Sequence, residues 1–244
     1  MNDGLAAVVG AGLTDPGFGV DVGGTAGGVA VAATPVEAAR ITAALHGRLW
    51  AGPTPAPFGD GVILGGAFAG TGRLLEWVVT ELLASDPAAA PERRAELFRA
   101  AAALPLGADG LMAKPISNLG WSSPRYADDA FDGRTDRHTA AHLVRAAIEG
   151  GALAVAHLLA PAIEAGLQIS EMRLSGPATG AAPGPLSGGE SVSAPLIQLR
   201  ADLFGVPVVI GQNPEASAAG AAALAGVAAG SFANHREASH AVAA

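Results

Sequence analysis

The sequence predicts an α/β domain, because short segments rich in β-branched residues alternate with longer helical patterns, and glycine-rich turns separate them. In residues 17–33, valines recur at every second position, which is the period of a strand. Residues 138–165 show the longest helical pattern, and residues 186–229 read as a turn, a helix, a strand and a helix. With 50% hydrophobic but only 5% aromatic residues, the 244-residue chain must build its core mainly from alanine, valine and leucine.

The first half of the chain begins with apolar residues 5–13, which suit a short helix, although a strand is an alternative. Residues 17–33 predict a hairpin, because glycines border its two valine-bearing segments. Residues 61–64 predict another strand, and residues 71–84 predict an amphipathic helix with its apolar side chains on one face. A second helix is expected over residues 91–104, since a proline stands where its first turn would be.

The second half opens with residues 105–137, which are rich in Gly, Pro, Asp and Arg and predict an irregular surface excursion before the long helix. A short strand is expected around Arg173, and another over residues 206–210. Residues 231–244 carry no signal for packing on a core and predict a disordered tail. The folded domain is therefore expected to span residues 1–230.

Charge and composition exclude several classes of function. A net charge of −8 with only 14 Lys and Arg residues argues against a nucleic-acid partner. The absence of cysteine excludes disulfides and cysteine-based zinc sites. The apolar pattern over residues 143–160 is interrupted by Arg145 and Glu149, which we expect to be structural ion-pair partners, and no basic segment followed by an apolar one opens the chain. We therefore expect no membrane partner and a cytoplasmic location.

A glycine pair, Gly188 and Gly189, stands directly before a predicted helix. Glycine lets a phosphate or nucleotide approach the backbone closely, and a helix N-terminus offers unpaired N–H groups and the positive end of its dipole. Ser193 lies in the first turn of that helix and could add a polar contact. The pattern indicates a nucleotide or phosphate site.

The order of motifs from this glycine pair onward resembles the C-terminal end of the FGGY carbohydrate kinases. That family's pattern runs G-G-G, a helix with Q-x-x-A-D, a strand with V-P-V, and then E-x-x-x-x-G-A-A. The residues that stand at matching spacing are Gly188, Gly189, Gln198, Ala201, Asp202, Val206, Pro207, Val208, Glu215, Gly220, Ala221 and Ala222.

Three further segments follow the family's order. The run from Asn2 through Asp3 and Gly4 resembles the stretch G-x-x-D-x-x-A-A-x-x-G-x-G, whose aspartate is the catalytic base. Gly24-Thr25-Ala26-Gly27 is similar to the phosphate loop G-T-S-G. Gly70-Thr71-Gly72, with Trp77 five residues on, resembles the G-G-x-x-x-x-W turn and helix that lies along the nucleotide.

The resemblance implies an actin-like ATPase lobe of the ribonuclease-H-like type, with a mixed sheet flanked by helices. It implies ATP and Mg²⁺ as cofactors, and a sugar or polyol as the small-molecule substrate. Asp3 would be the catalytic base, and Gly24, Thr25, Gly27 and Gly72 would bind the nucleotide together with Gly188, Gly189 and Ser193.

Other interpretations of these residues stay open. Asp3 could be the N-cap of the first helix, and the loop at Thr25 could be only a tight hairpin turn. The segment from Asp21 to Thr25 also resembles the D-x-G-G-T loop of the ROK sugar kinases, against which the lack of cysteine argues. His138 and His142 lie four residues apart and could share a metal, but no third ligand is apparent, so we expect no metal and a solvated helix N-terminus.

Two departures from the family pattern bear on function. Glu190 replaces a small residue beside the glycine pair, where a carboxylate would repel a polyphosphate. The sequence also begins two residues before the proposed base, so we expect the N-terminal, sugar-binding lobe of such kinases to be missing and the chain alone to have no activity. Apolar faces left by that lobe predict self-association and a weakly held segment before Gly23. The alternative is a decayed, non-catalytic lobe that acts as a binding protein.

Overall fold

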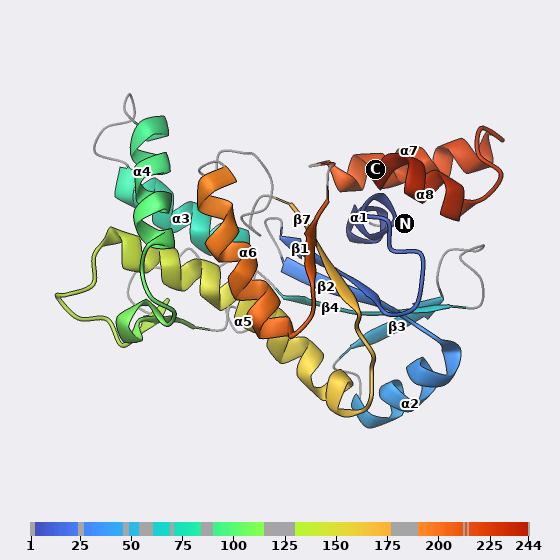
Figure 1. The fold of residues 1–244 in the computed structure, drawn as a ribbon, viewed down its shortest axis with the longest axis horizontal. Coiled ribbons are helices and arrows are strands. Elements are labelled where there is room, and N and C mark those ends of the chain that lie inside the picture. The colour runs from blue at the N-terminus through green and yellow to red at the C-terminus, as the bar shows by residue number, and fades with distance from the viewer. Residues whose placement is uncertain are drawn as a thin grey trace.

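The computed structural model describes residues 3–23, 27–45, 49–53, 61–68, 71–83, 90–114, 130–176, 190–211, 213 and 215–243. In these residues a six-stranded mixed sheet has the order β3-β4-β2-β1-β7-β8 and carries helices on both faces (Figure 1). Its strands are β1 (Phe18–Gly23), β2 (Gly27–Ala33), β3 (Trp50–Pro53), β4 (Val62–Phe68), β7 (Glu171–Ser175) and β8 (Val208–Ile210). A separate two-stranded sheet pairs β5 (Met112–Ala113) with β6 (Phe131–Asp132). The predicted α/β class with a mixed sheet is confirmed.

The sheet is antiparallel on one side and parallel on the other. β1 and β2 form the hairpin predicted for residues 17–33, and β2 and β3 both run antiparallel to β4. β1, β7 and β8 run parallel to one another. The carboxyl ends of these three strands therefore lie at the same edge of the sheet.

Helices cover the sheet in two layers. On one face α1 (Asp3–Gly10) packs on β1, β2 and β4, and α7 (Ala216–Ala228) and α8 (His235–Ala243) lie over α1. On the other face lie α2 (Pro35–Leu45), α5 (Ala140–Glu164) and α6 (Glu190–Phe204). The first half of α5 extends beyond the sheet and packs with α3 (Thr71–Leu83) and α4 (Ala90–Ala102) in a second apolar cluster (Figure 1).

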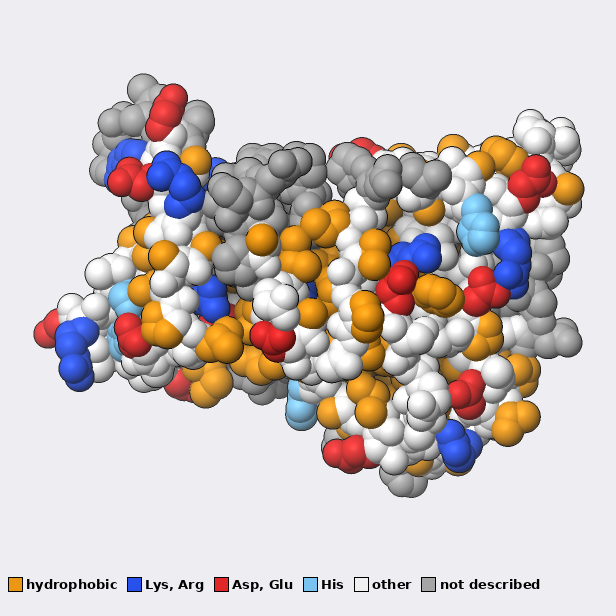
Figure 2. Space-filling view, in the orientation of Figure 1, with side chains coloured by type: hydrophobic (Ala, Val, Ile, Leu, Met, Phe, Trp, Pro, Cys, Tyr) orange, Lys and Arg blue, Asp and Glu red, His pale blue; other side chains and the backbone are white. Residues whose placement is uncertain are grey.

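Helix α5 is the one helix in the described ranges that is long and apolar enough to cross a membrane by length and composition. Half of its most apolar window is buried inside the domain, where Val144, Ile148 and Val155 are core residues. That burial fits the central helix of a packed domain. Figure 2 shows that hydrophobic side chains are also exposed over the middle of one face, and on the edge strand β8 Val209 and Ile210 are about 40% exposed (42% and 39%).

Helices α1 and α7 approach each other closely because glycines face one another at their crossing. A Cβ atom on Gly10 would overlap the carbonyl group of Ala216, and one on Gly220 would overlap the carbonyl group of Ala6. Close helix contact through small residues explains why such an alanine-rich sequence can bury α1. The segment before Gly23 is consequently well packed, with Ala6 to Leu13 buried, and the expectation that it is weakly held is wrong.

The prediction of a disordered tail over residues 231–244 is also wrong, because residues 235–243 form helix α8. Ala238 and Ser239 on this helix are fully buried, and the Ser239 hydroxyl donates to the Val9 carbonyl at 2.5 Å. Arg236 forms an ion pair with Asp15 at 2.6 Å. The sequence signal was weak because small residues, not large apolar ones, make the contact with α1.

Candidate functional site

One edge of the sheet collects three of the segments that sequence analysis associates with a nucleotide. In the register of the sheet, Gly23 at the end of β1 pairs with Gly27 at the start of β2, and Gly27 pairs with Phe68 at the end of β4. Val22 pairs with Ser175 near the end of β7. The loop between β1 and β2, the connection from β4 to α3, and the connection from β7 to α6 therefore all leave from this edge.

Close backbone approach occurs at the centre of the same edge. Gly176, just after β7, has φ of +90°, and a Cβ atom there would lie 2.5 Å from the carbonyl oxygen of Gly23. A larger residue would push the two strand ends apart. In open α/β sheets, ligands bind at the carboxyl ends of parallel strands, so this edge has the position of a ligand site.

The predicted nucleotide residues fall on and beyond this edge. Gly27 begins β2, Gly72 lies in the first turn of α3, and Ser193 is the fourth residue of α6. The others, Gly24, Thr25, Gly188 and Gly189, lie outside the described residues. Trp77 of α3 is partly buried and packs on the apolar cluster between α3, α4 and α5.

Asp3 begins helix α1, and its side chain is exposed. Its carboxylate accepts a hydrogen bond from the Gly4 N–H at 2.9 Å, a local contact at the positive end of the helix dipole. An exposed carboxylate at a helix N-terminus can serve both as part of a cap and as a proton acceptor, so both interpretations of Asp3 stay open.

A buried ion pair that the sequence does not predict lies just inside the loop-bearing edge. Asp21 in the middle of β1 and Arg200 of α6 are 3% and 2% exposed, and Nε of Arg200 donates to Oδ2 of Asp21 at 3.1 Å. Burial raises the pKa of Asp21, although the Arg200 guanidinium opposes that shift. The signal in the sequence was a single charge between Val20 and Val22 in an otherwise apolar strand.

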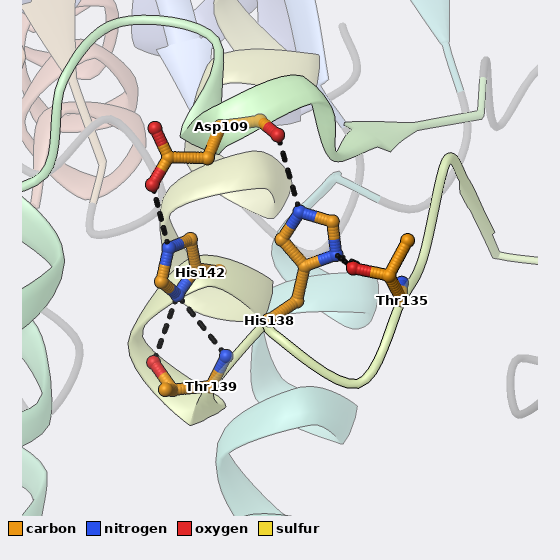
Figure 3. Close-up of polar contacts among 5 residues, drawn as sticks. All are labelled: Asp109, Thr135, His138, Thr139 and His142. Atoms are coloured by element: carbon orange, nitrogen blue, oxygen red, sulfur yellow. Dashed lines mark hydrogen bonds and ion pairs between the residues drawn. The ribbon is translucent and has the colours of Figure 1, made fainter.

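His138 and His142 do not meet as ligands of a metal (Figure 3). Nδ1 of each ring accepts the backbone N–H of a threonine three residues earlier, at 2.9 Å from Thr135 and 3.1 Å from Thr139. Each Nε2 therefore carries the proton, and the two Nε2 atoms lie 3.3 Å and 3.1 Å from the carbonyl oxygen and the carboxylate of Asp109. His142 is 8% exposed, so the expectation of a solvated helix terminus is wrong for this residue.

These histidines hold a left-handed turn against the start of α5. Gly107, Ala108, Asp109 and Gly110 all have positive φ, which is uncommon for the two residues that are not glycine. Glu149 fixes the other end of the turn, since its carboxylate accepts the Gly107 N–H at 3.0 Å and the Arg145 Nε–H at 2.5 Å. The expected structural pairing within α5 is confirmed.

Among the described residues, no three His, Asp or Glu side chains gather in a way that could hold a metal ion. A magnesium ion at the strand-end edge would therefore depend on ligands from a bound nucleotide or from residues outside the described ranges. Mg²⁺ commonly binds through substrate phosphates with few protein ligands, so the edge is compatible with that mode.

The domain has the architecture of an actin-like ATPase lobe, because solved kinases with that fold superpose on it. The xylulose kinase of Rhodospirillum rubrum superposes with a TM-score of 0.70 at 31% identity, over 97% of this chain and 43% of that one. The Plasmodium falciparum glycerol kinase, solved with ADP, gives a TM-score of 0.66 at 18% identity and supports the fold alone.

Sequence comparison identifies the family. Residues 23–229 match the C-terminal domain of the FGGY family of carbohydrate kinases, and the chain belongs to that family. It is 35% identical over 173 residues to the glycerol kinase of Bordetella parapertussis, which covers 69% of this chain. The aligned part is 30% of that relative's length, so this chain spans less than a third of the glycerol kinase it matches. The resemblance to FGGY kinases predicted from four motifs is confirmed.

Proposed function

We propose that this chain is the nucleotide-binding lobe of an ATP-dependent carbohydrate kinase that phosphorylates a hydroxyl group of a sugar or polyol. The observation that carries the proposal is that the strand ends of β1, β4 and β7, which lead into three glycine-containing segments, lie at one edge of the sheet. The family assignment supports the reaction class. A cytoplasmic location is part of the same proposal.

In the proposed reaction, the carboxylate of Asp3 accepts the proton of the substrate hydroxyl as its oxygen attacks the γ-phosphorus of ATP, and the bond to the bridging oxygen of ADP breaks. Backbone N–H groups of the loop at Gly24 and Thr25 would face the β- and γ-phosphates, and Gly188 and Gly189 would allow the α-phosphate or adenosine to approach α6. Magnesium bound to the phosphates would neutralise the charge that builds up during transfer.

The sugar contacts and half of the cleft would come from a partner lobe. This chain spans 30% of the glycerol kinase and 43% of the xylulose kinase to which it is similar. That partial coverage supports the proposal that an N-terminal lobe completes the active site. Without that lobe we expect nucleotide binding but no phosphoryl transfer.

Calorimetric titration of the whole chain with ADP and Mg²⁺ tests the binding half of the proposal. Wild-type protein should bind, and Gly189→Val should abolish or strongly weaken binding, because its side chain would fill the space that the nucleotide needs. Ala194→Val is the matched control, since it adds bulk at an exposed position of α6 and should leave affinity unchanged.

A separate assay of ADP release with pentoses, hexoses and glycerol should show no turnover by the chain alone. Robust turnover would contradict the half-enzyme interpretation.

A decayed, non-catalytic lobe is the second candidate, and the position of Glu190 favours it. Glu190 is the first residue of α6, and a carboxylate that turned toward the helix N-terminus would compete with a phosphate for the same N–H groups. Absence of ADP binding by the wild type, with binding restored in Glu190→Gly, would support this candidate over an active nucleotide lobe.

A further inference from the structure

The ion pair between Asp21 and Arg200 joins two elements that lead to different proposed nucleotide loops. Asp21 lies two residues before Gly23, the last residue of β1, after which the chain enters the glycine loop at Gly24. Arg200 is on α6, which starts at Glu190 directly after the Gly188 and Gly189 pair. The contact therefore crosses from the sheet to the helix layer beneath the loop-bearing edge.

Among the side chains of α6 that the structure describes, few are buried, and Phe204 at the end of the helix packs partly buried against the core. Of its side chains that the structure describes, Leu199 and Arg200 are the two that are buried, and the rest are partly or fully exposed. A leucine contact tolerates rotation of the helix, whereas a guanidinium that donates to a carboxylate fixes direction. Arg200 thus sets how α6 is rotated against β1, and with it where the start of the helix points.

The pair is a poor source of stability. Removing two charges from water costs free energy that their attraction recovers only in part, and apolar side chains of similar volume often give equal or greater stability. Burial raises the pKa of Asp21 above its usual value of 3.8, so keeping its carboxylate ionised at neutral pH opposes folding. If the pair only stabilised the packing of α6 on β1, two apolar side chains would stabilise that packing as well.

We infer that Asp21 and Arg200 are positioning residues, which fix α6 against β1 and so hold the end of β1 and the start of α6 in a set relation, where the two proposed nucleotide loops attach. The inference rests on the proposed function for its consequence in binding, but the structural coupling of β1 to α6 stands apart from it. The two residues need no direct contact with nucleotide in this role.

The test compares the whole wild-type chain with Asp21→Asn and with the double variant Asp21→Val/Arg200→Met. Asparagine keeps the shape of Asp21 but removes the charge, and the double variant replaces the pair by apolar side chains. Glu149→Gln is the matched control, because it breaks another buried ion pair that lies within α5. Each protein is measured for thermal unfolding, for hydrogen exchange in residues 190–204, and for affinity toward ADP with Mg²⁺.

Both pair variants should exchange faster in the first turns of α6 and bind ADP more weakly by about tenfold, as expected when a coupled buried contact is lost. The double variant should nevertheless keep a melting temperature close to that of the wild type. Glu149→Gln should lower the melting temperature while leaving α6 exchange and ADP affinity unchanged.

Wild-type exchange in α6 together with wild-type ADP affinity in the double variant would overturn the inference. Loss of affinity only in proportion to lost stability, including in Glu149→Gln, would also overturn it, since that result describes a purely structural pair. A wild type that does not bind ADP would refute the proposed function instead, and α6 exchange in Asp21→Asn would then decide the positioning role alone.

Discussion

At the scale of single residues, buried charged side chains contribute to the packing of a domain whose sequence is half hydrophobic. Asp21, Arg200, Arg145 and Glu149 are all buried, and each is part of an ion pair. An isolated charge within an apolar strand or helix is the sequence signal for such a pair, but it does not name the partner. Asp21 and Arg200 are 179 residues apart in the chain.

Asp3 gives the prediction that belongs to this scale, and it applies to a complex completed with the N-terminal lobe. If Asp3 accepts the substrate proton, Asp3→Asn keeps the shape but removes the base, so kcat should fall by ~10²–10⁴-fold with little change in nucleotide affinity. Steady-state kinetics at saturating sugar substrate and varied ATP concentration measure kcat and the KM for ATP. Asp132→Asn, at an exposed acid elsewhere, is the control and should have nearly normal kcat. If Asp3→Asn also had nearly normal kcat, Asp3 would not be the catalytic base.

At the scale of elements, the contact between α1 and α7 depends on the absence of side chains. Gly220→Ala would place a Cβ atom against the Ala6 carbonyl group, so the helices would have to separate. Alanine favours a helix by roughly 1 kcal/mol over glycine, whereas overpacking costs about 1–3 kcal/mol, so we expect net destabilisation. Denaturant unfolding measures the change. Ala221→Ser, at the exposed neighbouring position, should have little effect, and equal stability of Gly220→Ala and wild type would contradict this close contact.

Helix α8 is attached to the turn after α1 partly by charge. Burial alone would raise the pKa of Asp15, but hydrogen bonds from Thr14 and Arg236 and the charge of Arg236 outweigh it, so the pKa is lowered. A carboxylate with a lowered native pKa stabilises the folded state above its usual value of 3.8, and this contribution is lost as pH falls through the native value.

Asp15→Asn should therefore lower the urea midpoint at pH 7, and its difference from wild type should shrink toward zero as the pH falls through the lowered native pKa of Asp15. Urea titrations of the two proteins at several pH values test the expectation directly. The comparison cancels the other carboxylates, which titrate alike in both proteins. A difference that stayed constant with pH would mean that the ion pair with Arg236 does not stabilise the attachment.

At the scale of the whole molecule, α8 closes the layer over α1 and α7. Ending the chain after Gly230 would uncover the cluster that contains Val9, Ala223 and Leu224. We expect the shortened protein to unfold at lower temperature, to self-associate, and to lose hydrogen-exchange protection in residues 3–10. Light scattering and exchange measurements check these results. Unchanged protection of residues 3–10 would show that α8 is dispensable for holding α1.

The sequence by itself determined the fold class, the hairpin of residues 17–33, the long helix and the FGGY family. Those features depend on local period, turn chemistry and motif order, which adjacent residues express directly. The glycine pair that precedes α6 is likewise a local signal, because adjacent residues alone are enough to predict a nucleotide loop there.

Only the tertiary structure decided the rest. It shows that Asp21 pairs with Arg200, that two histidines contact Asp109, and that α8 packs on α1. Each contact joins distant parts of the chain through a few small or polar side chains, whose local pattern gives no period and no apolar run. Their partners depend on the order and register of the strands, because only that register fixes which residues share one edge or one face of the sheet.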